Sequence, residues 1–192
     1  MTVASKTPRR DRWADWAVAA LVVVALVLGL WLRNSVLYRT VDFAVSEAGI
    51  AGCVPAGWVQ QTGTDPLLRA RDPLGGRAGA VLELRSRPLA AQTEPNLVLD
   101  ALSLERAATV DAYKTLVTER VLVRGETAVQ RTFTYVLVDQ SPYVDHLPEV
   151  LRGVDVALRD EGRVIVVTFL AENDAFDAEY RYFRTFIDGL EY

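Results

Sequence analysis

The stretch RVIVVTFLAENDAFDAEYRYFRTFIDGL, residues 163–190, is the most informative part of the sequence, because it joins a strand to an amphipathic helix. Its first part, residues 164–167, reads Val-Ile-Val-Val and is apolar on both faces of a strand. Such a run is typical of a strand buried at the centre of a sheet. We therefore expect a central strand over 163–170.

The second part of this stretch has the spacing of one helix face. Its apolar residues recur at i, i+4, i+7, i+11 and i+14: Phe176, Tyr180, Phe183, Ile187 and Leu190. Asn173 or Asp174 is expected to cap this helix, and Asp177 and Glu179 suit its positive first turn. The pattern predicts a C-terminal helix that packs on the sheet.

Short strands surround this unit. The runs 115–123 and 127–138 flank a turn at 124–126, and the runs 150–158 and 163–170 flank another at 160–162. Earlier strands are expected over 58–62, 67–72 and 80–85. In the last of these, Ala80, Leu82 and Leu84 share one side, whereas Glu83 and Arg85 share the other.

A second helix is predicted over 96–112. Its expected inward face has helical spacing and consists of Leu97, Ala101, Leu104 and Ala108, with Asp100, Glu105 and Arg106 off that face. Strands, a helix, four strands in hairpins and a final helix predict an α+β fold, an antiparallel sheet with helices packed on it. We expect its core between the sheet and the C-terminal helix to contain Trp58, Phe133, Phe169, Phe176, Tyr180 and Phe183.

The N-terminal part has a different composition. Residues 13–32 contain one charged side chain, Asp15, and at about 1.5 Å per residue a helix of this length spans the roughly 30 Å of a bilayer core. Basic residues exceed acidic ones before this run, whereas Arg33 and Arg39 after it are balanced by Asp42 and Glu47. The positive-inside rule then places the N-terminus in the cytoplasm.

These patterns divide the chain into four segments. We expect a cytoplasmic basic tail over 1–12, a transmembrane helix over 13–32, a juxtamembrane connector over 33–50 and an extracytoplasmic domain over 51–192. The second half of the connector has the alternation of a strand at Val41, Phe43 and Val45. The predicted location is the inner (plasma) membrane, crossed once.

Two alternatives to an uncleaved anchor fit the sequence less well. A cleaved signal peptide would have a shorter apolar run followed by a small-x-small site, whereas this run is followed by Arg33 and Asn34. Ile50-Ala51-Gly52-Cys53 has the letters of a lipobox, but charged residues separate Cys53 from the apolar run. We expect Cys53 to be a half-buried small residue, with a free thiol for an intermolecular bridge as the alternative.

The body resembles the PsbP-like family, an α-β-α sandwich known from a photosystem II extrinsic protein and from bacterial secreted or membrane-anchored relatives. Three segments match its opening strand, its hairpin and its closing strand and helix: 54–58 (VPAGW), 123–128 (VRGETA) and 162–186. The resemblance implies an α/β/α sandwich and a role in binding or assembly of membrane complexes. None of the matching motifs is a reactive site.

No catalytic, cofactor-binding or metal-ligating residue is predicted. His146, the single histidine, lies near Ser141 and Asp145 in a loop and is interpreted as solvated. The carboxylates Glu172, Asp174, Asp177 and Glu179 lack the alternating loop of an EF-hand and are attributed to helix capping. Residues 75–79 (GGRAG) lack the pattern of a P-loop and are typical of a hairpin turn.

Charge argues against nucleic acid as a partner. The residues after Thr40 have 15 basic and 23 acidic side chains, a net charge of −8, whereas phosphate binding needs clustered basic charge. The sequence therefore predicts a single-pass membrane protein with an extracytoplasmic binding domain. The expected role is an accessory or assembly subunit of a larger membrane complex, for electron transport or photosynthesis if the family's habits hold. The alternative is a receptor-like domain that binds a small ligand or ion in the cleft between sheet and helix.

Overall fold

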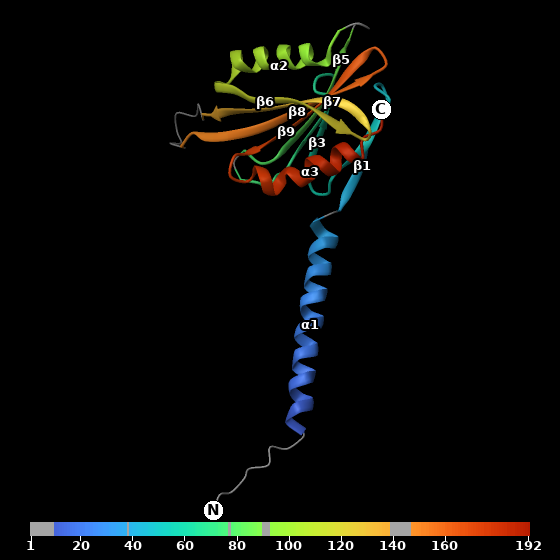
Figure 1. The fold of residues 1–192 in the computed structure, drawn as a ribbon, viewed down its shortest axis with the longest axis vertical. Helices are drawn as coiled ribbons and strands as arrows, with labels where there is room; N and C mark the ends of the chain where they lie inside the picture. The colour runs from blue at the N-terminus through green and yellow to red at the C-terminus, as the bar shows by residue number, and fades with distance from the viewer. Residues whose placement is uncertain (1–9, 38, 77, 90–92, 139–146) are drawn as a thin grey trace, which may run out of the picture. The chain divides into compact units, whose positions relative to one another are not determined.

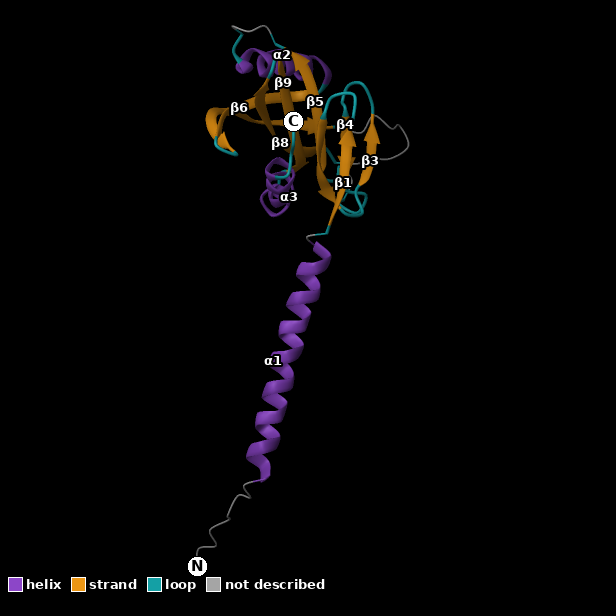
Figure 2. Ribbon diagram, turned by 90° about the vertical axis from the view of Figure 1, so that its right-hand side faces the viewer, coloured by secondary structure: helices purple, strands orange, loops and turns teal. Residues whose placement is uncertain are grey.

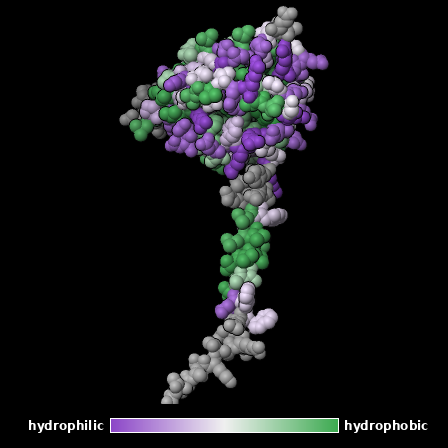
Figure 3. Space-filling view, in the orientation of Figure 1, coloured by the Kyte–Doolittle hydropathy of each residue, from purple (hydrophilic) through white to green (hydrophobic). Residues whose placement is uncertain are grey.

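The computed structural model describes residues 10–37, 39–76, 78–89, 93–138 and 147–192. The chain divides into two compact units, Met1–Arg39 and Thr40–Tyr192. The first unit contains one helix, α1 (Arg10–Leu37). Its segment Asp15–Leu32 is long and apolar enough to cross a membrane, by length and composition. Figure 3 shows this segment as a band of apolar side chains.

The second unit begins with a small two-stranded sheet. Its strands, β1 (Thr40–Val45) and β2 (Ile50–Pro55), pair antiparallel, which confirms the strand expected from the alternation of Val41, Phe43 and Val45. Phe43 and Ile50 are buried in the main core. Residues 40–50, expected to be part of the connector, thus belong to the folded unit.

The main sheet has seven antiparallel strands in the order β3-β4-β5-β9-β8-β7-β6. In chain order they are β3 (Val59–Thr62), β4 (Leu68–Arg71), β5 (Val81–Pro88), β6 (Asp111–Val123), β7 (Glu126–Leu137), β8 (Glu149–Asp160) and β9 (Arg163–Glu172). Strand β9 is the fourth of the seven, and Val164–Phe169 is buried from both sides. The apolar run therefore forms the central strand, as predicted.

Two helices cover opposite faces of this sheet (Figures 1 and 2). Helix α2 (Pro95–Thr109) packs on β6, β7 and β8, and helix α3 (Phe176–Asp188) packs on β9 and on β2. An antiparallel sheet between helices confirms the predicted α+β sandwich.

The larger core lies on the α3 face. Phe169 is at its centre, with ring centroids 5.4 Å from Phe176, 6.2 Å from Tyr180 and 5.7 Å from Phe183. Trp58 joins this core and packs edge-on against Tyr182. The predicted aromatic cluster is thus confirmed for five of its six members.

Phe133 is the exception, because it lies on the opposite face of the sheet. Its ring is covered by the guanidinium group of Arg106 from α2, 4.3 Å from the ring centroid. Opposite it on β8 is Gly153, where a Cβ atom would clash with the ring. Glycine therefore provides the space for this phenylalanine beneath α2.

The predicted inward face of α2 is wrong. Leu97 and Leu104 are 57% and 74% exposed, and the apolar residues that pack inward are Leu99 and Leu102. The helix turns a largely polar face to the sheet, because Arg106 and its neighbours form hydrogen bonds there. In a helix that packs through polar side chains, the apolar spacing therefore predicts the wrong face as the buried one.

Candidate functional site

A row of polar side chains crosses the whole main sheet on the α2 face. Each strand contributes one residue, paired with the next across the sheet: Gln61, Arg69, Glu83, Thr168, Asp155, Arg131 and Thr118. Residues directly opposite each other in antiparallel strands project to the same face. We call this set the polar row; α2 covers one end of it and leaves the other uncovered.

At the covered end, an ion pair joins α2 to the sheet. Arg106 donates from Nη1 to Oδ2 of Asp155 and from Nη2 to Oδ1, the latter at 3.0 Å. The Thr168 hydroxyl donates to the same Oδ1 at 2.6 Å. Asp155 is fully buried, and a buried carboxylate needs partners for its charge. A bidentate contact with the Arg106 guanidinium group and a hydrogen bond from the Thr168 hydroxyl provide them.

This pairing keeps Arg106 charged. Burial lowers the pKa of its guanidinium group, but the charge of Asp155 and the hydrogen bonds to it outweigh burial, so the pKa lies above its ordinary value. A cation therefore persists beneath α2 and stacks on Phe133.

A second arginine anchors the other end of α2. Arg131 of β7 is 5% exposed and donates to Asp100 at 2.6 Å, Asn96 at 2.9 Å and Ser103 at 3.0 Å, all on the helix. Its Nε donates to Thr118 of β6 at 3.1 Å. The contacts of Arg106 and Arg131 thus hold α2 on the sheet. In most surface helices a wider apolar stripe has this role.

The covered end has little capacity for acid–base chemistry. Both carboxylate oxygens of Asp155 already accept hydrogen bonds, and the Thr168 proton is directed at Asp155. A general base needs a free lone pair that faces a substrate. The arrangement instead fixes α2 on the sheet.

The uncovered end of the row has surplus positive charge. Glu83 is shared by two arginines, with Arg85 at 3.0 Å and Arg69 at 3.4 Å. Asp65 is likewise shared by Arg87 at 2.6 Å and Arg85 at 3.8 Å. Two carboxylates therefore serve three guanidinium groups.

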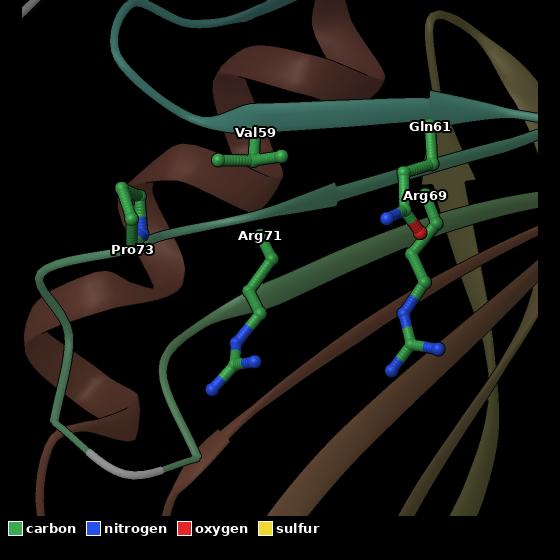
Figure 4. Close-up of a pocket in the computed structure, with 5 residues that line it drawn as sticks. All are labelled: Val59, Gln61, Arg69, Arg71 and Pro73. Carbon is green, nitrogen blue, oxygen red and sulfur yellow. The ribbon is translucent and has the colours of Figure 1, made fainter.

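An open groove of about 460 Å³ runs along this end. It is lined by Val59 and Gln61 of β3, Arg69 and Arg71 of β4, and Pro73. In Figure 4 the side chains of Arg69 and Arg71 extend from β4 in the same direction. Alternate residues of a strand share a face, and the Cα atoms of Arg69 and Arg71 are about 7 Å apart along it.

A smaller cavity of about 160 Å³ lies between the two ends. Its lining includes Arg69 and Glu83 from the uncovered end and Arg106, Phe133 and Tyr135 from beneath α2. Burial raises the pKa of the Tyr135 phenol, and the charge of Arg106 offsets only part of this effect. Tyr135 therefore offers a neutral hydroxyl to the cavity at physiological pH.

Carboxylates gather beyond the loop that joins β4 and β5. Burial raises the pKa of Glu179, and the negative charges of Asp72 and Glu172 raise it further.

In the loop that joins β4 and β5, Gly76 and Gly79 have positive φ angles of 62° and 56°, a conformation that favours glycine. This confirms the glycine-rich segment as the turn of a hairpin.

The predicted cap of α3 is wrong. The helix begins at Phe176 after Ala175, without a side-chain cap. Asn173 is instead held in the preceding turn, where its N–H donates to the carbonyl of Val150 at 2.9 Å. Asp177 does lie in the first turn and pairs with Arg152 at 3.4 Å.

The described residues that were considered for chemistry form no metal site. Within the described ranges, no three His, Cys, Asp or Glu side chains are grouped to hold a metal ion. His146, Ser141 and Asp145 lie outside the described residues. Cys53 is half-buried in β2, in agreement with the structural interpretation, and its thiol is free.

Sequence reasoning missed the polar row, although a signal was present. Thr168 is the single polar residue within 164–171 of β9, and Asp155 is the single polar residue within 153–158 of β8. Arg131 lies between Gln130 and Thr132 in β7 and gives no such signal. A buried polar residue requires a partner, so Thr168 and Asp155 predict contacts to a neighbouring element. The residues that these polar side chains contact can be identified only when the pairing register of the seven strands is known.

Comparison with known proteins gives a likeness in structure alone. Neither a family model nor a curated protein matches the sequence. Cyanobacterial PsbP (CyanoP) from Synechocystis sp. PCC 6803 is similar with a TM-score of 0.59 and 11% identity, over 81% of this chain and 93% of that one.

Two further solved structures share the fold. LpqN of Mycobacterium tuberculosis, which is involved in cell envelope biogenesis, has a TM-score of 0.52 and 12% identity over 79% of this chain and 89% of its own. The Ran-binding protein Mog1p of Saccharomyces cerevisiae has a TM-score of 0.53 and 8% identity over 80% of this chain and 95% of its own. These likenesses confirm the PsbP-like fold expected from the resemblance.

Proposed function

We propose that this protein is a single-pass membrane protein whose body is an extracytoplasmic binding domain. It acts as an accessory or assembly subunit of a larger membrane complex. An electron-transport or photosynthetic complex is the specific form that the PsbP-like resemblance favours.

The uncovered end of the polar row carries this proposal. Arg69 is half exposed at this end, and two carboxylates are shared among three arginines. The polar groups beneath α2 satisfy one another and so support the fold rather than a reaction. A rigid sheet with an exposed charged face is suited to recognition by charge complementarity.

Helix α1 supports the membrane part of the proposal. Its span Asp15–Leu32 is long enough to cross a bilayer, and the basic excess before it favours a cytoplasmic N-terminus. One of the similar proteins, Mog1p, is a Ran-binding protein, which fits a binding role, and another, LpqN, is involved in cell envelope biogenesis.

A small-ligand receptor is the second candidate, and one feature favours it. The 160 Å³ cavity beside Arg106 combines charged, aromatic and hydroxyl groups. Sites for small organic ligands usually measure about 300 to 1,000 Å³, so this cavity suits an ion or a very small molecule. The groove beside Arg69 and Arg71 is larger, about 460 Å³, and is lined by residues of β3 and β4, which favours an extended partner segment.

Co-purification from native membranes distinguishes the two candidates. The tagged full chain is purified in mild detergent, and the co-purifying chains are identified and quantified by mass spectrometry. A subunit should bring stoichiometric membrane-protein partners, and these should remain when an unrelated transmembrane helix replaces residues 10–37. A chain that purifies alone at native expression levels contradicts the subunit proposal and favours the receptor.

A further inference from the structure

We infer that the uncovered end of the polar row is a docking surface for an extended, carboxylate-rich segment of a partner protein. This inference rests on the proposed function, because it names the chemistry of the partner that the body would bind. It is carried by the local charge, the spacing of the arginines and the apolar lining of the groove.

Positive charge is concentrated in this part of the body. Residues 65–88 contain five arginines and three acidic residues, a net charge of +2, whereas the rest of the body after Thr40 has a net charge of −10. An acidic segment is attracted to this surface and repelled by most of the remainder. Charge alone therefore directs such a partner to β4 and β5.

Arg69 has capacity for a further carboxylate. Arg69 is half exposed and shares Glu83 with Arg85, so neither guanidinium group has a carboxylate of its own there. A guanidinium group has five N–H donors arranged to bind a carboxylate through two hydrogen bonds. An incoming carboxylate would supply the missing acceptors without the loss of a buried ion pair.

The spacing of Arg69 and Arg71 matches an extended peptide. Both side chains leave β4 in the same direction (Figure 4), separated by two residues of strand, or about 7 Å. Alternate side chains of an extended peptide have the same separation. Two acidic residues at i and i+2 can thus contact both arginines, while Val59 and Pro73 give apolar contacts to the remainder of the segment.

The acidic surroundings argue against a polyanion of high charge density. A nucleic acid strand would extend beyond the groove, toward Glu172 and the rest of an acidic body. A short peptide segment can remain beside Arg69 and Arg71 and therefore meets less of this repulsion. The inference therefore commits to a peptide.

A binding experiment with a defined probe tests this. The full chain in neutral-detergent micelles is titrated against a fluorescent octapeptide of alternating Glu and Val, and against the same peptide with Gln for Glu, by anisotropy. We expect the Glu peptide to bind at least ten-fold more tightly than the Gln peptide. The double variant Arg69→Glu with Arg71→Glu should lose at least ten-fold in affinity.

A matched control separates this surface from overall charge. Arg120 and Arg184 are exposed on β6 and α3, and their double change to Glu alters the net charge by the same amount. This control should stay within two-fold of wild type. The neutral pair Arg69→Gln with Arg71→Gln should also weaken binding, and circular dichroism checks that each variant is folded.

Three results would overturn the inference: no binding of the Glu peptide by wild type, equal loss in both charge-reversed pairs, or displacement of the peptide by micromolar inorganic phosphate. The last would indicate a site for small anions. If co-purifying partners remain bound to the variant changed at Arg69 and Arg71, the proposed function stands and only this docking surface is wrong. If wild type has no partner at all, the proposed function itself fails.

Discussion

At the residue scale, the contact between Arg106 and Asp155 is the main departure from a simple apolar sandwich. A buried ion pair contributes little net stability compared with apolar side chains of the same volume, but removal of one member leaves a charge without compensation. Thr168 and the Phe133 ring complete the surroundings of this pair. Its physical role is to fix the position of α2 on the sheet.

Asp155→Ala should therefore destabilise the body by about 3 to 5 kcal/mol, because Arg106 would remain beneath α2 without its partner. The measurement is chemical unfolding of the full chain in micelles, followed by intrinsic fluorescence. Arg106→Met combined with Asp155→Leu is the matched control and should cost clearly less. A double-variant cost equal to the sum of the costs of Asp155→Leu and Arg106→Met measured singly would show that the two residues are not coupled.

Phe183 provides the corresponding test of the apolar core. Its ring is buried and lies 5.7 Å from Phe169 and 5.4 Å from Tyr180. Phe183→Ala should cost about 3 to 5 kcal/mol through the cavity it leaves, as seen in thermal unfolding.

His146→Ala is the control for function as well as for stability. Because the sequence places His146 in a solvated loop, this change should stay within about 0.5 kcal/mol of wild type and retain the co-purifying partners. Loss of activity or of partners with unchanged stability would identify His146 as a functional residue.

At the element scale, the sequence predicts strands and α3 well and the orientation of α2 poorly. The central strand and the aromatic face of α3 follow from apolar patterns, since burial of apolar surface provides most of the driving force for packing there. Helix α2 packs through Arg106, Arg131 and their polar partners, which a hydrophobic pattern does not detect. Prediction of the polar row requires the pairing register of the strands, and this register depends on the long-range pairing between β5 and β9.

The first turn of α3 offers a pH-dependent test. Burial, and then Asp72 and Glu172, raise the pKa of Glu179 above its ordinary value of 4.5. A carboxyl group whose folded pKa is raised destabilises the fold above that pKa and ceases to do so once pH falls below the ordinary value. Glu179→Gln should therefore raise the melting temperature at pH 7, and the gain should fade as pH falls toward 4.5.

Asp177 is a close control for this experiment, because it lies in the same turn but is largely exposed beside Arg152. Asp177→Asn should give no comparable gain at pH 7. A gain from Glu179→Gln that persists unchanged at pH 4, or an equal gain from Asp177→Asn, would contradict the role assigned to burial and to the neighbouring carboxylates.

At the scale of the whole molecule, charge is divided between the parts of the chain. The residues up to Thr40 have a net charge of +4, and those after it −8. Basic flanks hold a transmembrane helix in one orientation, whereas a net charge far from zero favours solubility of an exposed domain. Within the acidic body, residues 65–88 differ from the remainder, because they have a net charge of +2.

This division leads to a prediction of topology. Lys6, Arg9, Arg10 and Arg12 precede the apolar span with only Asp11 to offset them, so the N-terminus should lie in the cytoplasm and Tyr192 outside. Protease added to intact spheroplasts of a bacterial host should digest the body, and the purified chain should retain the mass of the unprocessed sequence. Changing the four basic residues to Asn should produce a mixture of orientations, because the charge bias is then lost. Complete protection of the body from protease would reverse the assigned orientation, and a lipid-modified N-terminus at Cys53 would show that the chain is a processed lipoprotein instead.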